Sequence, residues 1–155
     1  MFDVPAVRLL GALVLGGVIG AEREIHGRPA GLRTHILVSL GSALFTLISL
    51  EGFVGAEPSR VAAQVVTGVG FLGAGTIMHD GVTIRGLTTA ASLWVSAAIG
   101  LAVAVGRWPE AVFTTAFAFL TLWVLPVLER YLNGSGARSD ETGNTQATGV
   151  PTDVV

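Results

Sequence analysis

The side chains of this sequence that could do chemistry are concentrated at residues 22–35, between two long apolar stretches. They are Glu22, Arg23, Glu24, His26, Arg28, Arg33 and His35. Glu22 and His26 are four residues apart, as are Glu24 and Arg28, so each pair would share one face of a helix. We take this segment as the candidate functional loop. It could bind an anion or a partner protein, or offer carboxylates to a hydrated cation. The alternative is a helix-end salt-bridge network with arginines that set the topology.

A second group of polar residues follows later in the chain and consists of His79, Asp80, Arg85, Thr88, Thr89 and Ser92. Mg²⁺ prefers a few carboxylate oxygens and keeps much of its water, so the candidate metal ligands are Glu22, Glu24 and Asp80. Histidine is a poor ligand for this hard cation, and His26 and His79 would lie next to a site or respond to pH. The spacing of these residues does not require a cofactor. If a cofactor binds, Mg²⁺ is the one that these residues would accommodate.

Several classes of function find no support in the sequence. It has no nucleophile–base arrangement, no H-E-x-x-H pattern and no phosphate-binding loop, so we do not expect an enzyme. Cysteine is absent, which excludes thiol chemistry and disulfides. The net charge of −2 gives no reason to expect a nucleic-acid partner.

Residues 68–73 read Gly-Val-Gly-Phe-Leu-Gly, which matches the spacing of a dinucleotide-binding loop. Such a loop follows a strand and needs an acidic residue about 20 positions later. Here the glycines lie inside an apolar stretch, and Asp80 follows too soon. We therefore predict that the glycines let this stretch pack closely against another helix. They are Gly68, Gly70, Gly73 and Gly75.

The elements that must position these residues are helices in a membrane. The chain of 155 residues is 51% hydrophobic and 13% charged, whereas soluble domains carry about 25% charged residues. Apolar runs cover residues 4–21, 36–54, 61–78, 87–105 and 111–132, and a helix of about 20 residues crosses a bilayer. We predict an all-α, polytopic membrane bundle of about five transmembrane helices over residues 1–132. Residues 133–155, rich in Gly, Ser and Thr, are predicted to form a disordered cytoplasmic tail.

The placement of arginines predicts the orientation in the membrane. With the N-terminus outside, the cytoplasmic side would hold Arg23, Arg28, Arg33, Arg85, Arg130 and Arg138. The outer side would hold Arg8, Arg60 and Arg107. Basic residues favour the cytoplasmic side, so we expect the N-terminus outside and the C-terminus in the cytoplasm.

An internal repeat is visible in the sequence. Residues 17–21 align with residues 70–74 at an offset of 53, which also pairs His26 with His79. After a two-residue insertion, residues 31–34 align with residues 86–89. Chance similarity between glycine-rich stretches is the alternative. If the repeat is real, the first two helices are repeated in parallel by the next two, and both loops frame one shared site.

Hydroxyl side chains form stripes on three of the predicted helices. Ser39, Ser42, Thr46 and Ser49 share one face, Thr88, Ser92 and Ser96 share another with Thr89 beside them, and Gln64 and Thr67 are one turn apart. Such side chains either form hydrogen bonds between helices or line a hydrophilic seam between the second, third and fourth helices. The absence of an acid or base deep in any predicted span weakens the case for a proton-coupled pump.

Two segments resemble the signatures of a known family. Residues 20–24 and 29–35 are similar to the first signature of the MgtC/SapB membrane proteins, and residues 68–75 and 85–94 to the second. The resemblance covers about residues 5–130. It implies a bacterial inner-membrane protein tied to growth at low magnesium and, in pathogens, to survival inside host cells. Founding members carry a soluble C-terminal domain after the helices. We expect only the short tail here, which puts a virulence role in doubt.

Two functions remain open at this stage. The first is a modulator of other membrane proteins in magnesium or ion homeostasis, which the close-packing glycines and the lack of a charge deep in the spans favour. The alternative is a transporter or channel for magnesium or another ion, which the repeat and the hydroxyl stripes favour. The expected partners are membrane lipid and other membrane proteins. Five spans are few for a transport pathway within one chain, which also leaves a homodimer open.

Overall fold

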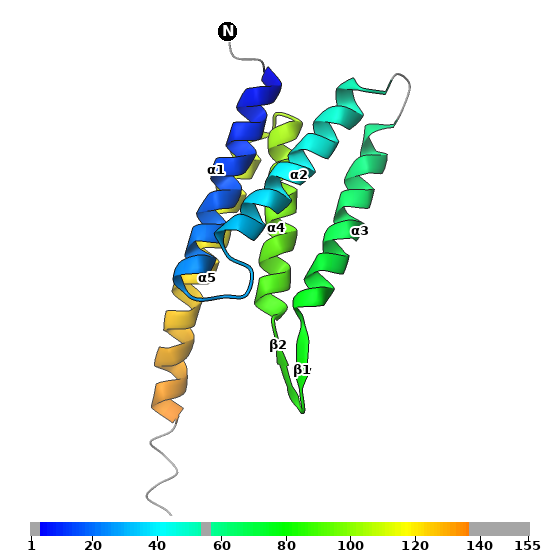
Figure 1. Ribbon diagram of the computed structural model, residues 1–155. Coiled ribbons are helices and arrows are strands. Elements are labelled where there is room, and N and C mark those ends of the chain that lie inside the picture. Colours follow the sequence, from blue (N-terminus) through cyan, green and yellow to red (C-terminus); the bar gives the residue numbers. More distant parts are fainter. Residues whose placement is uncertain (1–3, 54–56, 137–155) are drawn as a thin grey trace, which may run out of the picture.

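The computed structural model describes residues 4–53 and 57–136. Its five helices are α1 (Val4–Ile25), α2 (Leu32–Glu51), α3 (Pro58–Thr76), α4 (Leu87–Ala104) and α5 (Trp108–Gly136). A short hairpin of β1 (Met78–Asp80) and β2 (Thr83–Arg85) joins α3 to α4. The helices lie side by side as one bundle (Figure 1). The predicted all-α bundle of five helices is thereby confirmed.

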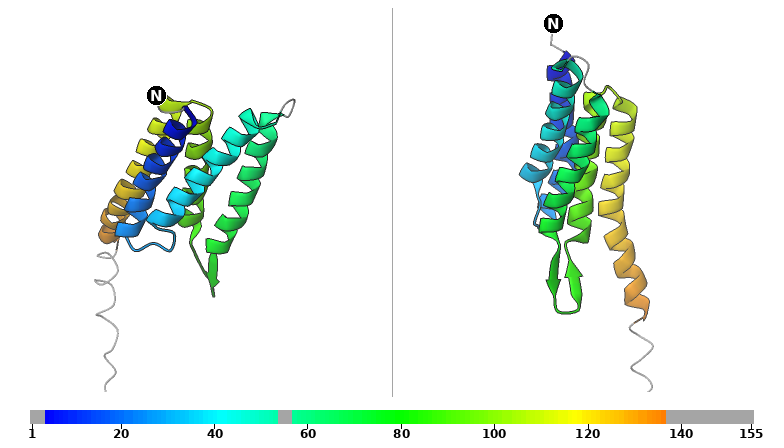
Figure 2. Two further views of the ribbon diagram at one scale, coloured as in Figure 1. Left: turned by 45° about the horizontal axis from the view of Figure 1, so that its top comes forward. Right: turned by 90° about the vertical axis from the view of Figure 1, so that its right-hand side faces the viewer.

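The bundle is that of a multi-pass membrane protein. By length and composition, the described helices α1, α2, α4 and α5 can each cross a bilayer. The third helix, α3, is more polar because Arg60, Gln64 and several glycines interrupt its apolar residues. It nevertheless packs against α2 and α4 and runs alongside them (Figure 2).

Small residues bring α1, α2 and α4 into close contact. A Cβ atom added to Gly16 would lie 2.6 Å from the Cβ of Ser39, and one added to Gly20 would lie 2.8 Å from the Cα of Leu32. On α4, a Cβ at Gly100 would collide with the backbone of Ser39. Helices in lipid associate largely through such close backbone approach. These three helices therefore form the tightly packed centre of the bundle.

Within each helix pair of the predicted repeat, the two helices contact each other, and they do so at aligned positions. Gly20 of α1 faces the side chain of His35 on α2, and Gly73 of α3 faces Ala90 on α4. Gly73 lies 53 residues after Gly20, and Ala90 follows His35 at the offset that includes the two-residue insertion. The loop between α1 and α2 and the hairpin between α3 and α4 lie at the same end of the bundle (Figure 1). This arrangement agrees with a parallel repeat.

Within the described chain, the predicted close packing of the α3 glycines is not found at three of the four positions. A Cβ atom at Gly68, Gly70 or Gly75 would meet no other atom within 4 Å, and all three residues are exposed. Only Gly73, among these four, contacts another helix. The reason is that α3 turns a single narrow face toward α4, so the remaining glycines point out of the bundle.

We call the end of the bundle that carries residues 26–31 and the β-hairpin the hairpin end. The sequence analysis did not predict the two strands of the hairpin, and Gly81 adopts a positive φ of 61° in the turn between them. The start of α1 and the end of α5 lie at opposite ends of the bundle (Figure 1), as expected for five helices that alternate in direction. Helix α5 continues through residues 133–136 of the predicted tail, and residues 137–155 lie outside the described residues.

Candidate functional site

A cluster of buried polar side chains lies at the hairpin end, between α1, α2 and α4. We call it the polar cluster, and its members are Glu22, Arg23, His35, Thr89 and Ser92, none more than 5% exposed. The sequence placed the first two in a loop, but α1 continues to Ile25 and carries them in its last turns. Because α2 begins at Leu32, Arg33 and His35 are helical as well. The loop proper is therefore residues 26–31.

Hydrogen bonds join the two sequence motifs within the polar cluster. Arg23 donates from Nη2 to the hydroxyl of Thr89 at 3.3 Å. The Nε2 atom of His35 lies 3.0 Å from the hydroxyl of Ser92, which also lies 2.9 Å from the carbonyl of Thr89. The Nδ1 atom of His35 lies 2.9 Å from the carbonyl of Gly31, which can only accept, so Nδ1 donates. His35 thereby ties the loop, α2 and α4 together.

Two charged groups of the polar cluster have atoms without a partner. The Oε2 atom of Glu22 and the Nε atom of Arg23 are buried and form no hydrogen bond with the described residues. The two side chains approach each other only to 3.8 Å, between Glu22 Oε2 and Arg23 Nη1. Buried polar groups are normally paired because leaving one unpaired costs about 1–3 kcal/mol. The unpaired atoms therefore mark this cluster as the candidate functional site.

The remaining residues of the candidate functional loop have separate roles. Glu24 accepts a hydrogen bond at Oε2 from the backbone N–H of Leu32 at 3.1 Å, so it caps α2, whose N-cap Gly31 has no side chain to do so. The exposed His26 lies 3.0 Å from the Oε1 atom of Glu22. Arg28 and Arg33 are exposed. The helix-end network weighed as the alternative thus exists, but it leaves the buried pair incompletely satisfied.

The second sequence motif divides between the polar cluster and the surface. Thr89 and Ser92 belong to the polar cluster, whereas His79, Asp80 and Arg85 are exposed on the hairpin, and Thr88 is exposed on α4. The hairpin carries His79, Asp80 and Arg85 beyond the ends of α3 and α4 (Figure 1).

The structure does not bring the three candidate metal ligands together. Glu22 is buried beside Arg23, Glu24 caps α2, and Asp80 lies on the hairpin. Within residues 4–53 and 57–136, no three His, Asp or Glu side chains are grouped so as to hold a metal ion. A magnesium site built from these three acids is therefore not assembled within the described part of one chain.

The hydroxyl stripes coincide only in part with the predicted seam. The stripe of α2 is buried along its whole length, and on α4 the buried hydroxyls are those of Thr89, Ser92 and Ser96 rather than Thr88. Ser39 donates across the interface to the carbonyl of Ala12 on α1 at 2.8 Å. Several others donate within their own helix, as Ser42 does to Val38 and Thr46 to Ser42. The buried hydroxyls of α2 and α4 thus lie inside the bundle, whereas Gln64 and Thr67 of α3 are exposed. Ser42 and Gln64 also line a groove between α2 and α3.

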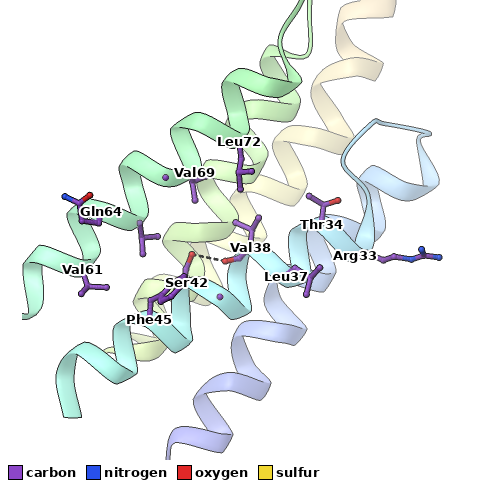
Figure 3. A pocket seen from close by; sticks show the side chains of 13 residues that line it. Arg33, Thr34, Leu37, Val38, Ser42, Phe45, Val61, Gln64, Val69 and Leu72 are labelled. Carbon is purple, nitrogen blue, oxygen red and sulfur yellow. Dashed lines mark hydrogen bonds between the residues drawn. The ribbon is translucent and has the colours of Figure 1, made fainter. Parts of the chain in front are cut away.

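A lateral groove with a volume of about 680 Å³ runs between α2 and α3. Apolar side chains such as Val38, Val69 and Leu72 line it, and the glycines Gly41 and Gly68 widen it (Figure 3). Arg33 lies at the end nearest the loop, with its guanidinium extending away from the groove (Figure 3). We call this feature the α2–α3 groove.

A second cavity, of about 480 Å³, lies at the hairpin end between α1, α4 and α5. We call it the hairpin-end cavity, and it reaches Arg23 and Thr89 of the polar cluster. Thr121 and Glu129 of α5 also line it, and the sequence analysis missed both. The available signal was their spacing: one hydroxyl and one carboxylate eight residues apart share a face of an otherwise apolar helix.

Comparison with known proteins agrees with the resemblance of the two signatures. The family model described as "MgtC family" matches residues 9–131. A protein of Escherichia coli K12, named "Putative magnesium transporter YhiD", is 48% identical over 126 residues, which cover 76% of this chain and 59% of that protein. "Protein MgtC" of Salmonella typhimurium LT2 is 50% identical over 109 residues, covering 70% of this chain and 47% of that protein.

A cyanobacterial relative extends the comparison. "Uncharacterized protein slr0014" of Synechocystis is 41% identical over 135 residues, which cover 87% of this chain and 58% of that protein. The chain therefore spans about half to three-fifths of the length of these curated relatives. No solved structure matches the chain significantly.

Proposed function

The chain belongs to the MgtC family, and on that premise we propose that it acts in magnesium or other ion homeostasis by modulating other proteins of a bacterial inner membrane. The chain is a membrane protein related to proteins named for magnesium. The proposal adds the mode of action, which is binding to a transmembrane helix of a partner protein rather than transport.

The observation that carries the proposal is the α2–α3 groove. In lipid, helices associate where small residues let two backbones approach. Gly41 on α2 and Gly68 on α3 line the groove, and a Cβ atom at either would meet no other atom of the chain within 4 Å. The groove is thus wide enough at these positions for another helix to approach closely. Its lining is mainly apolar, which suits a segment that is itself in the membrane.

The orientation is part of the same proposal. The described arginines at the hairpin end are Arg23, Arg28, Arg33 and Arg85, against Arg8, Arg60 and Arg107 at the other end. Because positive residues favour the cytoplasmic side, the hairpin end faces the cytoplasm. The hairpin is then exposed to the cytoplasm, and the buried polar cluster lies near the cytoplasmic end of the bundle.

A pair of glycine substitutions tests the groove. Gly68→Leu fills it, whereas Gly70→Leu places the same side chain on another exposed face of α3. Neither added side chain would meet an atom near its Cβ, so both variants should reach the membrane at normal abundance. In a bacterium whose growth at low magnesium depends on this protein, Gly68→Leu should abolish growth and Gly70→Leu should not. Equal growth of the two variants would exclude the groove as the partner site.

A transporter is the second candidate, favoured by the printed name of the Escherichia coli relative and by the buried hydroxyls of α2 and α4. Liposomes that contain the purified protein and a magnesium-sensitive dye separate the two functions. A modulator gives no flux above that of protein-free liposomes under any gradient. Robust flux that Glu22→Ala abolishes, in a variant that remains folded in detergent, would replace the modulator by a transporter.

A further inference from the structure

The hairpin-end cavity is lined by one buried arginine and one exposed arginine. Arg23, only 3% exposed, lines it together with the buried Thr89, and the exposed Arg28 lines it from the loop. Glu129 of α5 is the one acidic residue in its described lining. The cavity of about 480 Å³ is large enough for a small solute or for the headgroup of a lipid.

The guanidinium of Arg23 is buried but incompletely bonded. Its Nε atom has no partner among the described residues, and its contact with Glu22 is 3.8 Å long, which is beyond a hydrogen bond. A guanidinium presents its N–H groups as a planar fork that matches the oxygens of a carboxylate or a phosphate. Arg23 therefore retains the capacity to bind an anion in the cavity that it lines.

The N-terminus of α4 faces the same cavity. Gly86, Leu87, Thr88 and Thr89 all line it, and no side chain caps the first turn of this 18-residue helix. The first N–H groups of a helix lack partners within the helix and carry a partial positive charge, so they bind anions. Gly86 has a positive φ of 91°, and a Cβ atom there would collide with the carbonyl of Thr76. A capping side chain at that position is therefore excluded.

The wall formed by α5 is mainly apolar. Leu122, Leu125 and Pro126 line it beside the hydroxyl of Thr121. An anion with three or four oxygens can use the guanidinium, the threonine hydroxyls and the helix N-terminus at once. The apolar wall in addition suits a hydrocarbon portion attached to that anion.

From the buried Arg23, the exposed Arg28 and the uncapped start of α4, we propose that the hairpin-end cavity binds a phosphate group. The phosphate is carried by an anionic phospholipid headgroup or is free in solution. Two arginines outweigh Glu129 in the lining, and the phosphate oxygens can accept hydrogen bonds from the arginine guanidinium groups and from the first turn of α4. This site is separate from the α2–α3 groove, so it does not depend on the proposed function.

The test uses the whole purified chain in a neutral detergent. Its thermal unfolding is followed after addition of phosphatidylglycerol, of phosphatidylcholine, or of inorganic phosphate against chloride at equal ionic strength. Stabilisation by phosphatidylglycerol alone assigns the site to a lipid headgroup, and stabilisation by inorganic phosphate assigns it to the free anion. Either result supports the proposal. Absence of stabilisation in every arm overturns it and leaves the growth test of the groove unaffected.

Matched substitutions locate the site. Arg28→Gln removes an exposed cavity arginine without disturbing the core, and Arg33→Gln removes an exposed arginine at the same end that lines the α2–α3 groove instead. Losing one charge-assisted hydrogen bond should weaken binding about tenfold in Arg28→Gln. Arg33→Gln should bind as the unmodified protein does. Equal weakening in both variants would mean a general surface charge effect and would overturn the proposal.

Discussion

The guanidinium of Arg23 lies 3.3 Å from the hydroxyl of Thr89, a residue 66 positions later in the chain. One belongs to the end of α1 and the other to the start of α4, and each had been singled out in a separate sequence motif. Their contact, with that between His35 and Ser92, makes a single buried site from the two motifs. The two motifs can meet because the helices alternate in direction, which puts the α1–α2 loop and the α3–α4 hairpin at one end of the bundle (Figure 1).

The first prediction concerns Thr89 itself. Thr89→Val keeps the shape of the side chain but removes the acceptor for Arg23, leaving a buried guanidinium with one partner fewer. We expect the free energy of unfolding in detergent to fall by about 1–3 kcal/mol. Thr88→Val is the control, because the neighbouring hydroxyl is exposed. If the two variants are equally stable, the Arg23–Thr89 hydrogen bond contributes nothing to the fold.

A second prediction follows from the position of His35. This side chain is fully buried and contacts the carbonyl of Gly31 and the hydroxyl of Ser92. His35→Phe keeps a planar ring but leaves the carbonyl without its donor, so the free energy of unfolding should fall by about 1–3 kcal/mol. His79→Phe, at an exposed histidine of the hairpin, should change it much less. Denaturant unfolding followed by tryptophan fluorescence measures both, and a larger loss in the His79 variant would contradict the assignment.

A third prediction gives opposite changes in thermal stability for two glycines, one on α1 and one on α3. Gly20→Ala places a Cβ atom 2.8 Å from the Cα of Leu32, so α1 and α2 must move apart. Gly70→Ala meets open space, and alanine favours a helix over glycine by about 1 kcal/mol. The first variant should therefore unfold at a lower temperature than the unmodified protein and the second at an equal or higher one. The same sign in both variants would disprove the packing described here.

The existence and order of the five helices could be predicted from the sequence. A backbone in lipid must satisfy its own hydrogen bonds, so each long apolar run has to be a helix. The ends of the helices were less predictable, because a hydropathy pattern places the end of a span at the first charged residue. Glu22 and Arg23 continue α1 since neighbouring helices, rather than water, surround them.

The packing face of α3 could not be predicted. Gly68, Gly70, Gly73 and Gly75 look alike in the sequence, yet only Gly73 among them contacts α4. Glycine permits close approach but does not create a neighbour, so its presence cannot tell a packed face from an open one. A residue's type likewise does not identify its neighbour in the fold. The sequence therefore indicated Arg23 and Thr89 separately without predicting their contact, and it did not indicate Thr121 and Glu129.

The last prediction tests the acidic residues that the sequence nominated for magnesium. Glu24 accepts a hydrogen bond from the N–H of Leu32 at the start of α2, whereas Asp80 is exposed on the hairpin. Glu24→Ala should lower the free energy of unfolding by about 0.5–2 kcal/mol, as expected for the loss of a helix cap. The loss should be the same in magnesium and in a chelator, and Asp80→Asn should leave stability unchanged in both. A loss that appears only with magnesium present would instead show that these carboxylates bind the ion, because only then does the cation connect residues that the fold keeps apart.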